Sequence, residues 1–416
     1  MTVQFTVCFA ALVLFSYSLL FIFKKWMDRK TMVMVFLLLS VYHTISIFHF
    51  FFPLISGAGD DAFRFHQKAC DILASGSFEY HIGLGSRFFE NYLASFYFFF
   101  TDSLLVGQVF SVIMTAFSMV FLISICRLLG LGSYERMVIP IVFLLPAMIV
   151  FCPLTLKESH QLFFLVFSFY CFLNYVHGQQ MGWLAGSLLS VLIMGHFHRG
   201  LFPYSLFLSA GYVGMAGWET YQNHRIKQKQ CWLICLLLLF SSALFVVWTG
   251  RIKGENEIWA FIFNGRLVEY INLFRENALE EAMKKGGRAT YGLVLDTQTG
   301  PGFIQSFLKI LAFYHLAPFP WTAVGVKDFY AVFENAWRLL LLFFSIRFWL
   351  NAGANKRIYG FLLGIYLSLS VLWALGTINY GTAIRHHLLG YWIIVLLGWP
   401  SMVQLFKNIK SGLKGD

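Results

Sequence analysis

The sequence predicts an all-α, polytopic integral membrane protein with about eleven transmembrane helices. Of its 416 residues, 58% are hydrophobic and 12% are charged, whereas a soluble domain has roughly 25% charged residues. The single core of a water-soluble domain cannot bury that much apolar surface. The apolar residues also fall in runs close to the ~20 residues that cross a bilayer as a helix. These observations together indicate a chain that crosses the membrane many times.

Eleven apolar runs are predicted to span the membrane. They are 3–23, 32–56, 104–126, 137–153, 160–176, 183–197, 201–217, 231–249, 329–346, 358–378 and 388–406. Two other apolar stretches are not counted as spans. The stretch 88–100 is short and contains Glu90, and 303–325 contains Pro318 and Pro320. We expect interfacial or re-entrant helices in both stretches.

The distribution of basic residues predicts the orientation. Fifteen Lys and Arg residues fall on the side of Lys24 and Lys25, and six fall in the short loops of the opposite side. The side richer in basic residues is normally cytoplasmic, so the N-terminus is predicted outside and the C-terminus inside. The chain then reads as a single membrane domain, 1–416. Its first external loop, 57–103, holds amphipathic helices, and a large external loop, 250–328, contains a re-entrant or interfacial hairpin.

Composition excludes some classes of function. The net charge of +11 does not indicate a nucleic-acid partner, because the basic residues cluster at the ends of apolar runs instead of forming a basic surface. The seven cysteines lie mostly in apolar runs, and no pair has zinc-ligand spacing in a polar context. The sequence therefore predicts membrane lipid as a partner of the protein surface.

Four short polar segments that interrupt the apolar runs, called polar stops below, fall on the predicted external side. Because charged groups are costly near a bilayer, a collection of them on one side marks a working face. In chain order the stops contain Asp60, Asp61, Arg64 and His66; Lys157, Glu158 and His160; His196, His198 and Arg199; and Asn379, Arg385, His386 and His387.

The first stop pairs two acids with a helical pattern. Phe65, Ala69 and Ile72 have helical spacing just after the acids. One acid can cap this helix, but two exceed what a cap needs. A carboxylate at a membrane surface can act as a general base toward a hydroxyl group, or can bind a divalent cation. Asp60 and Asp61 are both candidates, and the neighbouring Arg64 and His66 are candidate substrate-binding residues.

The second and third stops offer cations. Lys157 and Glu158 can form an exposed ion pair of little energetic value, or Lys157 can contact a phosphate. His196 and His198, two residues apart, do not share a helical face, which is a poor pattern for a metal. Arg199 is the sharper candidate, because a guanidinium binds phosphate oxygens in a fork.

The last stop and one buried arginine complete the set. Arg385 suits a phosphate, and His386 can donate a proton or a hydrogen bond to it. Arg338 lies within a predicted span, where an arginine costs about 2.5–3.5 kcal/mol on insertion scales. It should therefore face protein or a wet cavity. A pair with Glu334 one turn earlier explains Arg338 as well as ligand binding does.

A family resemblance adds to this interpretation. Two acids followed by an aromatic residue, Ala, Leu and Gly-x-Phe, over 60–78, resemble the first outer loop of GT-C-type membrane glycosyltransferases. Stretches beginning at Pro153, Pro318 and Asn379 resemble parts of bacterial surface-polysaccharide proteins. The resemblance implies a polyprenyl-phosphate-linked sugar donor and a catalytic base at the first-loop acids. In the usual GT-C layout this loop follows the first span; here it follows the second. That departure indicates an extra leading helix or a Wzy-like polysaccharide polymerase with another fold.

The sequence is therefore interpreted as a membrane glycosyltransferase or polysaccharide polymerase of the bacterial cytoplasmic (inner) membrane, active at its external, periplasmic face. The donor is a polyprenyl-(pyro)phosphate-linked saccharide, the acceptor is a saccharide, and polysaccharide-assembly proteins are expected partners. No cofactor is assigned, and a divalent cation stays an alternative. Asp60 or Asp61 would deprotonate the acceptor, while Arg199, Arg385 and Lys157 would neutralise the leaving phosphate. The alternatives are a transporter or flippase of lipid-linked saccharide, with ionisable groups near mid-membrane, and a non-catalytic scaffold.

Overall fold

The computed structural model describes residues 3–52, 58–76, 84–222, 266–284, 289–353 and 355–412. Within these ranges the regular elements are helices, and β-type pairing is limited to one isolated bridge between Thr290 and Asn379. The chain forms two compact units. Unit 1 comprises Met1–Leu206, Leu341–Tyr366 and His387–Asp416, and unit 2 comprises Phe207–Leu340 and Leu367–His386.

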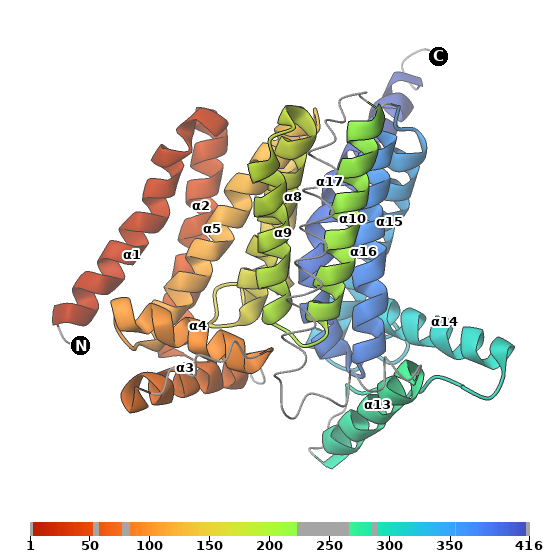
Figure 1. Ribbon diagram of the computed structural model, residues 1–416, viewed down its shortest axis with the longest axis horizontal. Helices are drawn as coiled ribbons and strands as arrows, with labels where there is room; N and C mark the ends of the chain where they lie inside the picture. The colour runs from red at the N-terminus through yellow and green to blue at the C-terminus, as the bar shows by residue number, and fades with distance from the viewer. Residues whose placement is uncertain are drawn as a thin grey trace. The chain divides into compact units, whose positions relative to one another are not determined.

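Figure 1 shows the helices of the described ranges. They are α1 (Val3–Ile22), η1 (Lys24–Trp26), α2 (Arg29–Phe51), α3 (Ala58–Ser75), α4 (Ser86–Phe99), α5 (Leu104–Leu128), η2 (Gly132–Tyr134), α6 (Glu135–Phe143), α7 (Pro146–Phe151), α8 (Lys157–Gly178), α9 (Met181–His196), α10 (Leu201–Gln222), α13 (Leu267–Lys284), α14 (Gly300–Leu316), α15 (Val326–Leu350), α16 (Lys356–Gly376) and α17 (Tyr380–Gly412).

Among the described residues, seven helices are long and apolar enough to cross a membrane: α1, α2, α5, α8, α15, α16 and α17. The shorter α9 is also apolar. Helices dominate because lipid offers no partner for backbone N–H and C=O groups, which must be satisfied within the segment. The all-α, multi-pass membrane class predicted from the sequence is confirmed. The count of eleven spans and the orientation stay predictions, and the predicted span 231–249 lies outside the described residues.

One predicted span takes a different form. The run 137–153 is not one helix but two short ones, α6 and α7, separated at Leu144 and Leu145. Pro146 is the first residue of α7, and Leu145 before it has an extended ψ of 126°. Proline disfavours the helical conformation in the residue that precedes it and cannot donate to the preceding turn. The proline therefore divides this run.

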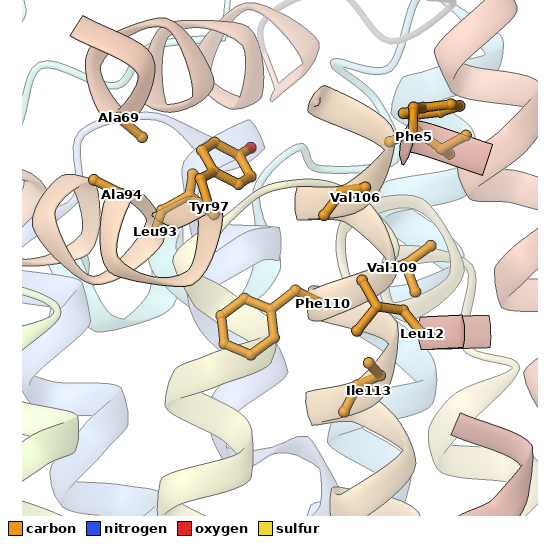
Figure 2. Packing of buried hydrophobic residues seen from close by; sticks show 11 residues of the cluster. Phe5, Leu12, Ala69, Leu93, Ala94, Tyr97, Val106, Val109, Phe110 and Ile113 are labelled. Carbon is orange, nitrogen blue, oxygen red and sulfur yellow. The ribbon is translucent and has the colours of Figure 1, made fainter. Parts of the chain in front are cut away.

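Helix α5 is the centre of unit 1 and is buried along almost its whole length. It packs against α1 and α2, and also against α8. Figure 2 shows Leu12 of α1 beside Val109 of α5, and Ala69 of α3 facing Ala94 of α4. Alanines at that contact let α3 and α4 approach closely, which anchors α3 to the rest of unit 1.

Unit 1 has two chemically different ends. The basic end comprises residues 24–30, 127–136, 347–359 and 401–410. Arg127 and Glu135 form an ion pair within the second of these segments. An ion pair between Arg136 and Asp28 joins the first segment to the second, and a hydrogen bond from the Tyr359 hydroxyl to the Leu129 carbonyl (3.2 Å) joins the third segment to the second. The α3–α4 end comprises residues 58–76, 84–103, 152–158 and 196–200. There α3 and α4 lie crosswise at the end of the helix bundle (Figure 1).

In unit 2, α13 and α14 run crosswise to α15 (Figure 1). Helix α14 begins at a Thr299 cap, whose side chain accepts the Gly302 N–H at 3.1 Å. The residues before α14 run beside those before α17, because the Tyr291 N–H donates to the Ile378 carbonyl at 2.8 Å. This pairing links the predicted external loop 250–328 to the polar stop at 379–386.

Candidate functional site

Helix α3 forms where the amphipathic pattern predicts it. Ala62, Phe65 and Ala69 are buried at helical spacing. Asp60 and Asp61 lie in the first turn, where backbone N–H groups lack helical partners and the helix dipole favours negative charge. Asp60 is exposed. Asp61 is partly buried and forms an ion pair with Arg64 at 3.1 Å. The two candidate bases therefore have different surroundings.

An apolar cluster joins three of the four predicted polar stops. Its buried members come from α3, α4, the loop before α8 and the turn after α9: Ala62, Phe65, Phe89, Leu154, Leu156 and Phe197. All of them except Phe89 lie within or next to the first, second or third stop in sequence. A hydrogen bond from the Gly85 N–H to the His196 carbonyl (2.8 Å) holds the turn against the start of α4. Segments far apart in the chain thus meet at the α3–α4 end of unit 1.

The Phe65 ring brings two cations together. The Arg64 guanidinium lies 5.3 Å from the ring centroid, and the Lys157 ammonium lies 6.0 Å from it. Contacts of this kind are worth roughly 0.5–1 kcal/mol when exposed. The ring therefore positions cations from α3 and α8 beside the acids of α3.

Glu90 is a site residue that the sequence analysis did not select. Burial raises the pKa of its carboxyl group above the usual value. The positive charges of Arg64, Lys68, Arg87 and Lys157 act in the opposite direction and lower this pKa. Glu90 therefore shares its surroundings with four cations from α3, α4 and α8. A lone acid inside the apolar stretch 88–100 is the sequence feature that could have identified it.

The histidines of the third stop stabilise the turn between α9 and α10. His196 Nδ1 bonds to the Leu192 carbonyl at 2.8 Å, and its ring contacts Phe88. His198 Nδ1 accepts the Gly200 N–H at 3.1 Å. Arg199 is exposed in this turn, and a Cβ atom built on Gly85 would lie 3.4 Å from its Cγ. The stop therefore presents Arg199 beside the start of α4.

His66 holds α3 on α4. Its Nδ1 lies 3.0 Å from the Tyr97 hydroxyl, and Cys70 Sγ lies 3.7 Å from the same nitrogen. Burial lowers the pKa of His66, and the negative charge of Asp102 opposes that shift. The lowered pKa favours the neutral imidazole at the interface of the two helices.

The second stop is buried behind Lys157. Glu158 is 8% exposed and His160 is fully buried. The His160 ring lies 4.9–5.9 Å from four aromatic rings, and its Nε2 lies 3.4 Å from the Ser111 hydroxyl. The four rings are those of Phe89, Tyr92, Phe110 and Phe197. The sequence analysis placed His160 in the stop but not among the site residues. Its position one turn after Lys157 pointed to it.

In unit 2, Arg338 faces protein groups. It is 2% exposed and donates to the Asn335 side-chain oxygen and, at 3.4 Å, to the His315 carbonyl. Asn335 in turn donates to the Ala317 carbonyl at 2.9 Å. The guanidinium thereby links α15 to the end of α14, in agreement with the expectation that it faces protein or a wet cavity.

His386 is fixed at the end of α16. Its ring stacks on Trp373 with centroids 3.8 Å apart, and its Nδ1 lies 2.9 Å from the Thr377 hydroxyl. Arg385, partly buried, precedes it on α17. Arg338, Arg385 and His386 belong to unit 2.

Arg275 and Asp328 are two further buried charged residues of unit 2. Arg275 of α13 is 1% exposed, and its guanidinium donates at 2.6–3.0 Å to the carbonyls of Leu293, Ala374, Leu375 and Thr377. It thus satisfies the last carbonyls of α16, which have no partner within the helix. The Asp328 carboxylate accepts the Val324 and Gly325 N–H groups and the Tyr380 hydroxyl. No sequence pattern indicates these partners.

In the part of the chain that the structure describes, no three His, Cys, Asp or Glu side chains are grouped to hold a metal ion. Comparisons of the chain with protein-family models, with curated proteins and with solved structures find no match. A functional assignment therefore depends on the geometry and chemistry of these residues.

Proposed function

We propose that this protein is a membrane glycosyltransferase or polysaccharide polymerase. It takes a polyprenyl-(pyro)phosphate-linked saccharide donor and acts at the external face of the bacterial cytoplasmic membrane. The observation that carries the proposal is the meeting of the α3 acids, Lys157 and the Arg199 turn on one apolar cluster. Transfer from a lipid phosphate needs a base and cations together, and these segments provide both.

The acids act on the acceptor. Asp60 or Asp61 takes the proton of the acceptor hydroxyl as its oxygen bonds to the anomeric carbon of the donor. The bond from that carbon to the phosphate oxygen breaks, and the phosphate leaves with the electron pair. Asp60 is exposed and accessible to a polar acceptor, whereas Asp61 is partly neutralised by Arg64. Both stay candidates for the base.

The cations act on the leaving phosphate. Lys157 and Arg199 in unit 1 provide positive charge at the α3–α4 end. Arg385 and His386 are proposed separately, as phosphate ligands within unit 2. Charge that develops on the leaving group is stabilised best by donors already fixed in place. Phe65 fixes Lys157 in this way.

The crosswise helices suit a donor that arrives from the lipid. Helix α3 exposes Phe63, and α4 exposes Phe98 and Phe99 at its end. An amphipathic helix with exposed aromatic side chains lies in the membrane interface. Such a position would let the polyprenyl chain stay in the bilayer while its phosphate reaches the cations.

A specific observation favours transport as the second candidate function. Polar pairs are buried between the long helices of unit 1. Ser16 and His43 join α1 to α2 (2.8 Å), Gln108 and His49 join α5 to α2 (3.0 Å), and Ser111 and His160 join α5 to α8 (3.4 Å). Ionisable groups within a membrane are frequently part of a transport path. A flippase of lipid-linked saccharide is the corresponding alternative.

Purified protein in lipid nanodiscs, supplied with a radiolabelled polyprenyl-pyrophosphate-linked oligosaccharide, tests the proposal. We expect Asp60→Asn or Asp61→Asn to lower the transfer rate by about 10²–10⁴-fold, with donor binding retained. Asp71→Asn is the matched control. Asp71 is an exposed acid on the same helix, and its carboxylate lies 3.9 Å from the Lys68 ammonium. Full activity in both acid variants contradicts the proposal. Movement of intact donor across proteoliposomes, without transfer, favours the flippase.

A further inference from the structure

The basic end of unit 1 contains a cavity that plays no part in the proposed transfer. Its volume is about 560 Å³, and it opens between the ends of α15 and α17 and the start of α16. The polar side chains that line it are those of Arg347, Asn351, Asn355, Tyr359, Ser401, Gln404 and Asn408. A cavity of this size is within the range that small ligands and headgroups occupy.

The lining of this cavity fits an anion. Arg347 is its one charged lining residue, so no carboxylate competes for the guanidinium. Within the described residues, the Arg347 side chain has no ion-pair partner, and the side chains of Gln404 and Asn408 have no hydrogen-bond partner. A guanidinium binds phosphate oxygens in a fork, and amide N–H groups can satisfy the remaining oxygens.

The surroundings add positive charge. Lys356 and Arg357 open α16, and Lys407 and Lys410 lie in the last turns of α17. Helix α16 begins at the cavity, where its first N–H groups and its dipole also favour an anion. The cavity therefore combines a fork-shaped donor, neutral amides and a positive field.

The apolar side chains near the cavity indicate where such an anion comes from. Ile346 and Leu350 are exposed on α15, and Phe406 and Ile409 are exposed on α17. Each lies within one turn of a lining residue on its own helix. Acyl chains can pack on these side chains while a headgroup fills the cavity, whereas a free phosphate ion would use none of them.

We propose that this cavity binds the phosphodiester headgroup of an anionic phospholipid, with Arg347 forked to the phosphate and the amides of α15 and α17 around it. Basic pockets between membrane helices take anionic lipid headgroups. The proposal is independent of the glycosyltransferase assignment, because the site shares no residue with it.

Binding of short-chain phosphatidylglycerol to the purified full-length protein tests this site, with short-chain phosphatidylcholine as the neutral comparison. We expect phosphatidylglycerol to bind about tenfold more tightly, and Arg347→Gln to abolish that difference. Arg347→Lys keeps the charge and loses the fork, so it should retain part of the preference. Asn408→Asp places a carboxylate at an exposed lining position and should weaken binding by about tenfold without removing a packed side chain.

Lys24→Gln is the matched control, because Lys24 is an exposed cation of the same end outside the cavity. We expect it to change the affinity by less than roughly twofold, since an exposed distant charge is screened by salt. An equal loss in Lys24→Gln and Arg347→Gln, or equal affinity for the two lipids, overturns the proposal. Displacement of the lipid by an equal concentration of inorganic phosphate also overturns it, in favour of a free-phosphate site. Each variant is compared after its elution profile and unfolding temperature match those of the wild type.

Discussion

The arginines of the two units differ in the partners of their guanidinium groups. In unit 2, Arg275 is buried and donates to four backbone carbonyls, and Arg338 is buried against a carboxamide and a carbonyl. At the α3–α4 end of unit 1, Arg64 is exposed, pairs with Asp61 and lies over the Phe65 ring. All three residues look alike in a sequence. Their partners divide them into cations that hold the fold and cations that stay accessible.

This difference shows how a membrane protein uses positive charge. A buried guanidinium needs several acceptors, because an unpaired charge in a low dielectric is expensive. Backbone carbonyls at the end of a helix provide those acceptors without adding a second charge. An accessible cation keeps its donors for a ligand but contributes little to stability. Stability and ligand binding should therefore respond to different arginines.

The largest expected effect comes from Arg275→Met. This change leaves the carbonyls of Ala374, Leu375 and Thr377 without their donor, and we expect a loss of about 3–5 kcal/mol in unfolding free energy. Arg64→Met is the matched variant, for which we expect a change within about 1 kcal/mol. Thermal unfolding of the purified protein in detergent measures both. Equal losses in the two variants would break the comparison between the units.

The contacts of Arg275 also show where sequence reasoning stops. Hydropathy predicts the long helices because lipid leaves the backbone no alternative, and the amphipathic pattern predicts α3. Pro146 marks the break in 137–153, but a hydropathy average does not detect it. Three of the four carbonyls that Arg275 reaches lie about a hundred residues further along the chain. No local pattern records that distance.

The candidate site was also predicted only in part from the sequence. One-sided polar stops predict that Asp60, Lys157 and Arg199 share a face, and their segments do meet in unit 1. The apolar residues that join these segments, such as Phe65 and Phe197, resemble the other phenylalanines of the chain. Glu90 and His160 acquire their surroundings only from that packing. A sequence can thus select chemical groups, but the assembly of those groups depends on tertiary contacts.

The packing beneath α3 should respond to Gly107→Ala. A Cβ atom on Gly107 would lie 3.0 Å from Thr155 Oγ1, and it would also clash with the Tyr97 hydroxyl. We expect a loss of about 1–3 kcal/mol, the usual effect of overpacking. Gly214→Ala is the control, because its Cβ meets nothing within 4 Å. There the higher helix propensity of alanine should stabilise the protein by up to about 1 kcal/mol. Equal effects in both variants would show that the α4–α5 contact is loose.

A smaller effect should appear as a dependence of stability on pH. Burial holds the pKa of His66 below its ordinary value, so the unfolded chain binds a proton at this position more readily than the folded one. The folding stability that results from this pKa difference is fully present above the unfolded pKa of about 6.5. It is lost as the pH falls toward the pKa of the folded state. We expect His66→Gln to remove a slope of at most about 1.4 kcal/mol per pH unit in that range.

Asp102 gives this prediction a sharper form. Its negative charge raises the pKa of His66 and so opposes the effect of burial. Asp102→Asn should extend the loss of stability to lower pH, and His66→Gln should make the protein insensitive to the Asp102 change in this range. Cys70 and Tyr97, the other titratable groups that contact His66, have pKa values raised by burial and stay neutral there. Unfolding temperatures at several pH values measure the three variants. An unchanged slope in His66→Gln would place the titration elsewhere.

The smallest expected effect on stability is the most informative about function. A double-mutant cycle of Asp61→Asn and Arg64→Met should give a coupling of about 0.2–0.5 kcal/mol in unfolding free energy, as for other exposed pairs one helical turn apart. The same cycle can be measured on the rate of saccharide transfer. If Arg64 orients Asp61 or tunes its charge for the acceptor, the coupling in the rate should exceed the coupling in stability. Equal and small values in both measurements would make this pair an ordinary surface contact and would leave Asp60 as the candidate base.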